Sequence, residues 1–180
     1  MTLRILLDGT ELASIIGGQY IGVATQAVLN CIKVMKYGQL VTEVKDIVDA
    51  IGLALDVARD TKVPSVIVIG PLVLPSQELD NAVCIPTLAG ARHILRCAPQ
   101  VTDALAKGIP VITPAGTQQR DAKNYSPARV PGVICVGATD IGDKMANSSN
   151  FGDAVTLFAP GVDAFSGYFE DRLSNTAVAA

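Results

Sequence analysis

The stretch "TEVKDIVDAIGLALDVARDTKVPSVIVIG", residues 42–70, decides the fold class. Over residues 42–59 apolar side chains recur three or four positions apart while acidic side chains occupy other faces, so the pattern predicts an amphipathic helix. The run that follows, Pro64 to Gly70, is short, continuous and rich in β-branched residues, which is typical of a strand buried on both faces. A buried strand after a helix indicates a βαβ unit, so the sequence predicts an α/β fold with a mostly parallel sheet.

The rest of the chain repeats this alternation of apolar runs and helical patterns. Two shorter helices are predicted, at Thr10 to Ile16 with Thr10 as N-cap, and at Val101 to Lys107. Further strands are predicted at Leu3 to Leu7, Ala27 to Val34, Ile109 to Thr113, Val133 to Asp140 and Ala154 to Gly161. Prolines interrupt residues 72–99, where no element is assigned beyond a turn or two of helix in "ARHILRC". One domain over residues 1–180 is expected.

Composition narrows the classes of partner. The chain has 180 residues, a net charge of −3 and a pI near 5.0, and it has no basic cluster, so we expect no binding to nucleic acid. Mean hydropathy is +0.40, yet no apolar run is long enough to cross a membrane, so no membrane association is expected. The first residues lack the apolar core of a signal peptide, and we therefore expect a cytoplasmic protein.

Cysteine and histidine usage argues against a metal centre. The four cysteines are widely spaced and the chain has a single histidine, so a zinc site lacks ligands. We expect no metal and no cofactor. The simplest interpretation of the cysteines is that they are buried, reduced thiols that pack as small hydrophobic residues.

An ordered set of motifs then places the chain beside a known family. The motifs are "NYSPARVPGVICVGATD" at residues 124–140, "PAGT" at 114–117, "SNFG" at 149–152, "APG" at 159–161 and "DGTELAS" at 8–14. Together they resemble the subtilisin-like serine peptidases, or subtilases, and especially the proteinase-K-like members. This resemblance implies a three-layer subtilisin-like fold, with a mostly parallel sheet flanked by helices, that is truncated at both ends and carries an apparent insertion around residues 72–99.

The resemblance also shows what the chain lacks at the positions of the family's catalytic groups. A subtilase needs a serine nucleophile, a histidine base, an aspartate that orients the histidine, and an asparagine that donates to the oxyanion. The nucleophile motif falls on residues 174–179, with Ala177 in place of the serine. Asp8 and Glu11 stand at the two histidines of the base motif, and Thr117 stands at the oxyanion asparagine. We therefore expect no serine peptidase activity.

Three other family features are altered. The strand that ends in the catalytic aspartate is missing or replaced, and Leu3 to Asp8 itself looks like such a strand, so Asp8 matches either place. The substrate-pairing segment becomes Gly70 to Val73, in which Pro71 removes a backbone donor. The calcium site uses carbonyls at Pro131 and Val133 plus an aspartate, whose position Thr156 occupies, so we expect this site to be lost.

Two functions of different classes follow. The first is a catalytically degenerate protein that acts by binding a partner or a ligand. The alternative is a repurposed enzyme of isomerase, cyclase or lyase type that uses Asp8 and Glu11 as acid-base groups and Thr117 as a donor to a small molecule. Purely structural roles stay open: Asp8 as a helix cap, Glu11 complementing the helix dipole, and Thr117 closing a turn.

The remaining candidates are weaker. His93, with Arg92 and Arg96, would bind an anion if the insertion folds over the cleft, and otherwise forms a solvated basic patch. Tyr125 would line a ligand pocket or belong to the core. Because the truncation would leave an apolar face uncovered, we expect a homodimer or a partner chain to cover it.

Overall fold

A computed structural model of the chain describes residues 2–6, 9–35, 42–80, 101–168 and 172–176. Its centre is a six-stranded sheet in the order β2-β1-β3-β4-β5-β6, and every neighbouring pair in it is parallel. The strands are β1 (Thr2–Leu6), β2 (Val28–Ile32), β3 (Ser65–Ile69), β4 (Val111–Pro114), β5 (Ile134–Thr139) and β6 (Leu157–Pro160). The predicted α/β class, the parallel sheet and each of its strands are confirmed, with small differences at the strand ends.

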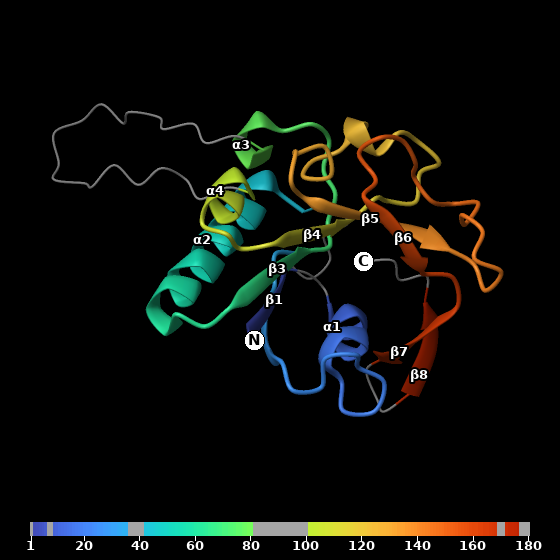
Figure 1. Ribbon diagram of the computed structural model, residues 1–180, viewed down its shortest axis with the longest axis horizontal. Coiled ribbons are helices and arrows are strands. Elements are labelled where there is room, and N and C mark those ends of the chain that lie inside the picture. The colour runs from blue at the N-terminus through green and yellow to red at the C-terminus, as the bar shows by residue number, and fades with distance from the viewer. Residues whose placement is uncertain (1, 7–8, 36–41, 81–100, 169–171, 177–180) are drawn as a thin grey trace, which may run out of the picture.

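The sheet separates two layers of helix (Figure 1). Helix α2 (Val44–Thr61) and the short helices α3 (Gln77–Asp80) and α4 (Val101–Ala106) lie on one side, and α1 (Thr10–Gly17) lies on the other. Strand β3 has apolar side chains on both of its faces, and all five of its residues are buried because helices cover both sides of the sheet. Ile67 and Ile69 pack against α2 and α4, whereas Val66 and Val68 pack against Leu12 of α1. The alternation of side chains along a strand thus builds two separate cores.

Helix α2 confirms the period read from the sequence. Its buried residues, which lie three or four positions apart or side by side, are Ile47, Val48, Ala50, Ile51, Gly52, Ala54 and Leu55. Its exposed face carries ion pairs such as Lys45 with Asp49. The helix ends at Lys62, which adopts a left-handed conformation and whose N–H bonds to the carbonyl of Ala58 at 3.0 Å. Burial of these apolar residues is what stabilises α2, since helix propensity alone contributes little to the stability of a helix.

The C-terminal part of the chain contains two strands that the sequence did not predict. Strand β8 (Arg172–Thr176) pairs antiparallel with β7 (Ala164–Tyr168). Backbone pairing between the two strands, rather than local propensity, sets the conformation here. Strand β7 lies beside α1 on the side of the sheet opposite α2.

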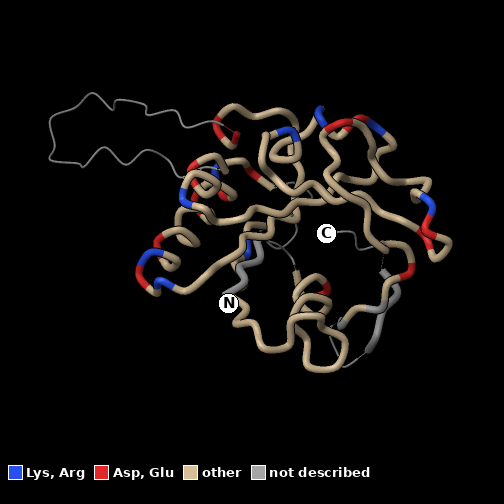
Figure 2. Tube along the Cα trace, viewed as in Figure 1, with Lys and Arg blue, Asp and Glu red and all other residues tan. Residues whose placement is uncertain are grey.

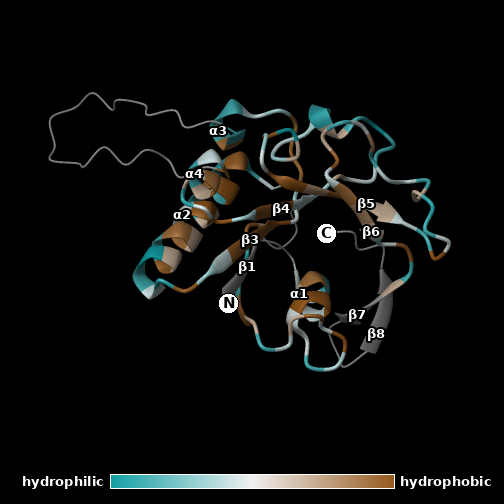
Figure 3. Ribbon diagram, viewed as in Figure 1, coloured by the Kyte–Doolittle hydropathy of each residue, from teal (hydrophilic) through white to brown (hydrophobic). Residues whose placement is uncertain are grey.

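Colouring by hydropathy shows the apolar strands and the inner faces of the helices in brown (Figure 3). None of the helices in the described residues is long and apolar enough to span a bilayer. The short helix α3 falls in the region that the sequence left unassigned, and the possible helical turn in "ARHILRC" lies outside the described residues.

Candidate functional site

The carboxyl ends of three central strands form the edge where a ligand site is expected. Strand β1 leads to α1 and then to β2 on one side, whereas β3 lies on its other side, so the strand order reverses between β1 and β3. In open α/β sheets the crevice beyond the carboxyl ends at such a reversal is the usual binding site. The segments there are Gly9–Glu11 after β1, Gly70–Val73 after β3 and Ala115–Thr117 after β4.

The first segment begins helix α1. Its N-cap is Gly9, not Thr10 as predicted, and no side chain caps the helix. The first helical hydrogen bond runs from the N–H of Ala13 to the carbonyl of Gly9, at 2.6 Å. Glu11 lies in the first turn and is half-buried, and the hydroxyl of Ser14 donates to its carbonyl at 2.6 Å. The carboxylate thus lies where the helix dipole favours negative charge.

The third segment is held by one buried amide, the side chain of Asn150. Its Nδ2 donates to the carbonyl of Ala115 at 2.7 Å and to Oε1 of Gln118 at 2.9 Å. Its Oδ1 accepts from the N–H groups of Gln118 and Arg120, both at 2.9 Å. Asn150 has no exposed surface, and its own N–H bonds to the carbonyl of Gly116. A single side chain therefore fixes the turn that carries Thr117.

The backbone of this turn requires glycine at position 116. Gly116 has a φ of +100°, and a Cβ there would lie 2.6 Å from Nδ2 of Asn150 and 2.7 Å from Cδ1 of Leu72. The segments that follow β3 and β4 therefore touch. Thr117, the next residue, is exposed. Thr117 and Glu11, the two described members of the predicted catalytic set, thus lie beyond the carboxyl ends of strands of the same sheet.

The middle segment is tied to a distant loop. Val73 and Ser126 exchange two backbone hydrogen bonds, at 3.0 and 2.9 Å, in an antiparallel bridge. The Ser126 hydroxyl donates to Oδ2 of Asp80 at 2.8 Å and accepts from the N–H of Ser76 at 2.9 Å. Arg129 forms an ion pair with the same carboxylate oxygen. Asp80 is buried, so this cluster anchors the segment that follows β3.

Sequence reasoning missed both Asn150 and Asp80 as organising residues. Asn150 belongs to the "SNFG" motif, and nothing in that motif distinguishes its role from the roles of its neighbours. Asp80 lies in the stretch where prolines obscure the pattern, and its partner Ser126 is 46 positions away in sequence. The one available signal was "NYSPA", since its serine is the hydroxyl that Asp80 binds.

The other predicted residues fall into two groups. Asp8, Arg92, His93, Arg96 and Ala177 lie outside the described residues. Tyr125 is half-buried on the loop between β4 and β5, where its N–H bonds to the carbonyl of Ala122 and its own carbonyl accepts from Arg129.

The residues at the family's calcium position do not suit that ion. The hydroxyl of Thr156 donates to the carbonyl of Val133 at 3.3 Å and accepts from the N–H of Cys135 at 3.1 Å. The carbonyl oxygen of Val133 thus accepts from the hydroxyl of Thr156, and position 156 supplies no carboxylate. Calcium prefers several oxygen ligands, including carboxylates, so the set does not fit. Elsewhere in the described ranges no group of His, Cys, Asp or Glu is arranged to hold a metal ion.

The two described cysteines differ in environment. Cys135 is fully buried in β5, and burial raises the pKa of its thiol to about 11, so it is protonated and unreactive at neutral pH. Cys31 of β2 is exposed, which corrects the expectation of buried thiols at that position. Its exposure arises because β2 is an edge strand.

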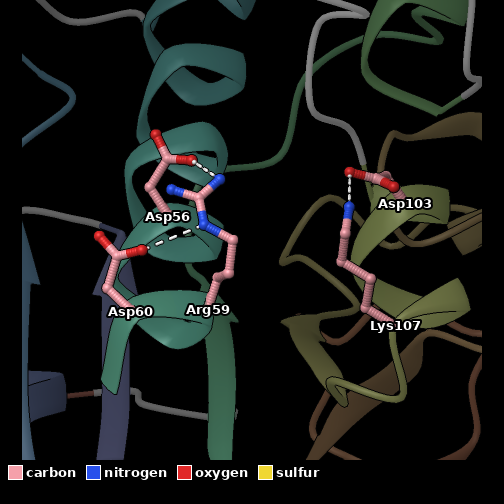
Figure 4. Close-up of polar contacts among 5 residues, drawn as sticks. All are labelled: Asp56, Arg59, Asp60, Asp103 and Lys107. Atoms are coloured by element: carbon pink, nitrogen blue, oxygen red, sulfur yellow. Dashed lines mark hydrogen bonds and ion pairs between the residues drawn. The ribbon is translucent and has the colours of Figure 1, made fainter. Parts of the chain in front are cut away.

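Two grooves are lined by described residues, and neither includes Glu11 or Thr117. The larger groove, of about 810 Å3, lies at the amino ends of β3 and β4, between the C-terminal turns of α2 and α4. Arg59 at its rim pairs with Asp56 at 3.2 Å and with Asp60 at 3.1 Å, and Lys107 pairs with Asp103 (Figure 4). The smaller, of about 390 Å3, lies between α2 and the end of β2.

Comparisons with known proteins agree with this geometry. Over 78 residues the chain is 37% identical to subtilisin-like protease 2 of Pseudogymnoascus destructans, and over 61 residues it is 46% identical to a cuticle-degrading serine protease of Arthrobotrys oligospora. These alignments cover 43% and 34% of the chain but only 20% and 15% of the relatives. The chain thus spans a fifth or less of the curated relatives that it matches.

Solved structures show the fold. A cold-adapted subtilisin-like serine proteinase superposes on 98% of the chain with a TM-score of 0.78 and 22% identity, over 68% of its own length. A prenylagaramide maturation protease superposes with a TM-score of 0.73 and 20% identity, also over 68% of its length. The predicted subtilisin-like fold is confirmed. A model of the subtilase family matches residues 9–179, nearly the whole chain, and the protein therefore belongs to the subtilase family.

Proposed function

We propose that this protein is a subtilase-family member without serine peptidase activity, and that it acts by binding a partner polypeptide. The observation that carries the first part is the alanine at position 177. Its motif begins in β8, the strand that contains Ser174 to Thr176, so Ala177 directly follows a described strand. A methyl group cannot attack a carbonyl, and the mechanism has no substitute for that step.

The described edge of the sheet supports the same conclusion. Glu11 supplies a carboxylate and Thr117 a hydroxyl, but none of the three edge segments carries an imidazole, because His93 is the only histidine in the sequence. Pro71 lacks the N–H that an extended substrate would need in the segment after β3. The residues of a triad act as a unit, so losing several together leaves little catalysis.

Peptidase assays test this part of the proposal. We expect no cleavage of fluorogenic peptides and no labelling by a fluorophosphonate, while an active subtilase assayed in parallel gives both. The variant Ala177→Ser should stay inactive as well, because the base is also replaced. Cleavage by the natural chain that a fluorophosphonate blocks would overturn the proposal. Activity in Ala177→Ser alone would show that only the nucleophile had been lost and would overturn the claim of a wider loss.

The binding surface that we propose is the α1 side of strands β4 to β6. On the α2 side of β4, Val111 and Thr113 are fully buried, but Ile112 and Pro114 on the α1 side are only half-buried. Leu157 of β6, which is in register with Val136 of β5, is 46% exposed. An apolar polypeptide segment of a partner is the occupant that we propose for this half-covered face.

Dye binding tests whether this face is open. We expect the folded protein to enhance the fluorescence of 8-anilinonaphthalene-1-sulfonate, and we expect Leu157→Lys to reduce the enhancement. Leu53→Lys, at an exposed leucine of α2, is the matched control and should leave it unchanged. A folded natural chain that binds no dye, or a loss that is equal in the two variants, would mean that the β6 side of the sheet is not the open surface.

A further inference from the structure

From Leu12 onward, helix α1 and the loop after it form a surface without charge. From Leu12 to Ile32 the sequence contains 21 residues and no Asp, Glu, Lys, Arg or His. Figure 2 shows hardly any blue or red along α1 and the loop that leads to β2, in contrast to the helices on the other side of the sheet. Leu12, Ala13, Ile15 and Ile16 of α1 are apolar, yet Leu12 is the only buried residue of this helix.

Large apolar side chains stand out from this surface. Tyr20 and Val23, at the tip of the loop, are 93% and 91% exposed, and Val28, which begins β2, is 61% exposed. Their loop is not loosely attached: the N–H groups of Val23 and Ala24 bond to the carbonyls of Ile15 and Ile16 at 3.1 and 2.7 Å. A fixed apolar patch on a protein surface marks an interaction site.

Strand β2 supplies the backbone groups for that interaction. Among the described residues β2 pairs with β1 alone, so its other edge presents N–H and C=O groups without a strand partner. Proteins usually protect such an edge with charge or proline, and Val28–Ile32 contains neither. The opposite edge strand, β6, does contain a proline, Pro160. The β2 edge is therefore the one that is suited to pairing.

We propose that the protein forms a two-fold symmetric dimer in which β2 pairs antiparallel with β2 of a second copy. The two six-stranded sheets then form one continuous sheet. The register that pairs all five residues places Asn30 opposite its own copy at the axis, Val28 opposite Ile32, and Leu29 opposite Cys31. These are apolar cross-strand pairs around one amide pair, the kind that stabilises a sheet.

The absence of charge is what selects a second copy as the occupant. In an isologous interface a surface meets itself, so any charged side chain would face a like charge near the axis. The stretch from Leu12 to Ile32, which includes all of β2, has none.

This dimer is independent of catalytic status. It uses the β2 edge, whereas the proposed partner surface lies at β4 to β6, on the other side of β1 and β3. A failed peptidase prediction would leave the dimer standing, and a monomeric protein would leave the proposed function standing.

Light scattering after size exclusion gives the first test. At micromolar concentration we expect twice the chain mass of 18.7 kDa. Asn30→Lys should raise the dimer dissociation constant at least ~100-fold, because two like charges then meet at the axis. Ile141→Lys, at a fully exposed site after β5, is the matched control and should remain dimeric. A natural chain that is monomeric, or a dimer that survives Asn30→Lys with its circular dichroism unchanged, overturns the proposal.

A cross-link tests the register and does not depend on how Asn30→Lys folds. Directly opposite residues of an antiparallel pair lie about 4.5–5.5 Å apart at Cα, within the range for a disulfide. In a Cys31→Ser background, Asn30→Cys should give a covalent dimer on a non-reducing gel under mild oxidation. Ile141→Cys in the same background, at a fully exposed site away from β2, should not. Equal cross-linking in the two, or none in Asn30→Cys, overturns the proposed pairing.

Discussion

Replacing Asn150 by alanine should destabilise the turn that carries Thr117. The side chain is fully buried and satisfies three backbone groups, the carbonyl of Ala115 and the N–H groups of Gln118 and Arg120. Each buried hydrogen bond contributes about 1 kcal/mol, and groups left without a partner raise the cost. We therefore expect Asn150→Ala to lower the free energy of unfolding by about 3–4 kcal/mol.

Urea denaturation gives the total, and amide hydrogen exchange gives the location of the effect. The amides of Gln118 and Arg120 should lose protection in Asn150→Ala, but should keep it in Asn150→Asp, which retains the accepting oxygen. Asn147→Ala, at an exposed asparagine three positions earlier, is the control and should change stability by less than about 0.5 kcal/mol. A loss below about 1 kcal/mol in Asn150→Ala, with both amides still protected, would refute the role given to this side chain.

Three further outcomes follow from the same structure. Gly116→Ala should cost about 2 kcal/mol more than Gly108→Ala in thermal denaturation, because both have positive φ but only the Cβ at 116 meets other atoms within 3 Å. Asp80→Ala should cost about 3 kcal/mol, since it leaves Ser126 and Arg129 without their acceptor; a loss no larger than that of Asp49→Ala on the surface would contradict this. Burial raises the pKa of the Cys135 thiol to about 11. The contribution of this protonated thiol to the free energy of unfolding is therefore complete below pH 9 and is lost as the pH rises through 11, by roughly 1.4 kcal/mol per pH unit. Cys135→Ala should remove that part of the slope in alkaline unfolding curves, and identical slopes would contradict the assignment.

The sequence predicted those elements whose conformation depends on their own pattern. Helix α2 carries a period of 3.6 that burial of one face enforces, and β3 is a continuous apolar run that is buried on both faces, so both were predicted nearly to their ends. The β7–β8 pair was missed because Ala164–Tyr168 has no alternation, and its structure comes from Arg172–Thr176 across the ladder. A strand that is stabilised by its partner leaves little trace in its own residues.

The candidate site divides in the same way. Motifs suggested Glu11 and Thr117 as candidates, and the structure places Glu11 in the first turn of α1 and Thr117 three residues after β4. Asp80 and Asn150 act through groups that lie 46 and about 30 positions away in sequence, and such pairings form only when the chain is folded. No local pattern encodes a hydrogen bond of that span, so only the tertiary structure reveals which buried polar residue holds a loop.

The position of β1 constrains the order in which this chain can assemble during synthesis. Thr2–Leu6 lies in the middle of the sheet, with β2 on one side and β3 on the other. During synthesis β1 therefore emerges before either neighbour, and both of its edges are paired only after Ile69 has been made. Proteolysis after residue 6 would also do more than shorten an edge, because it would separate β2 from β3 and divide the sheet in two.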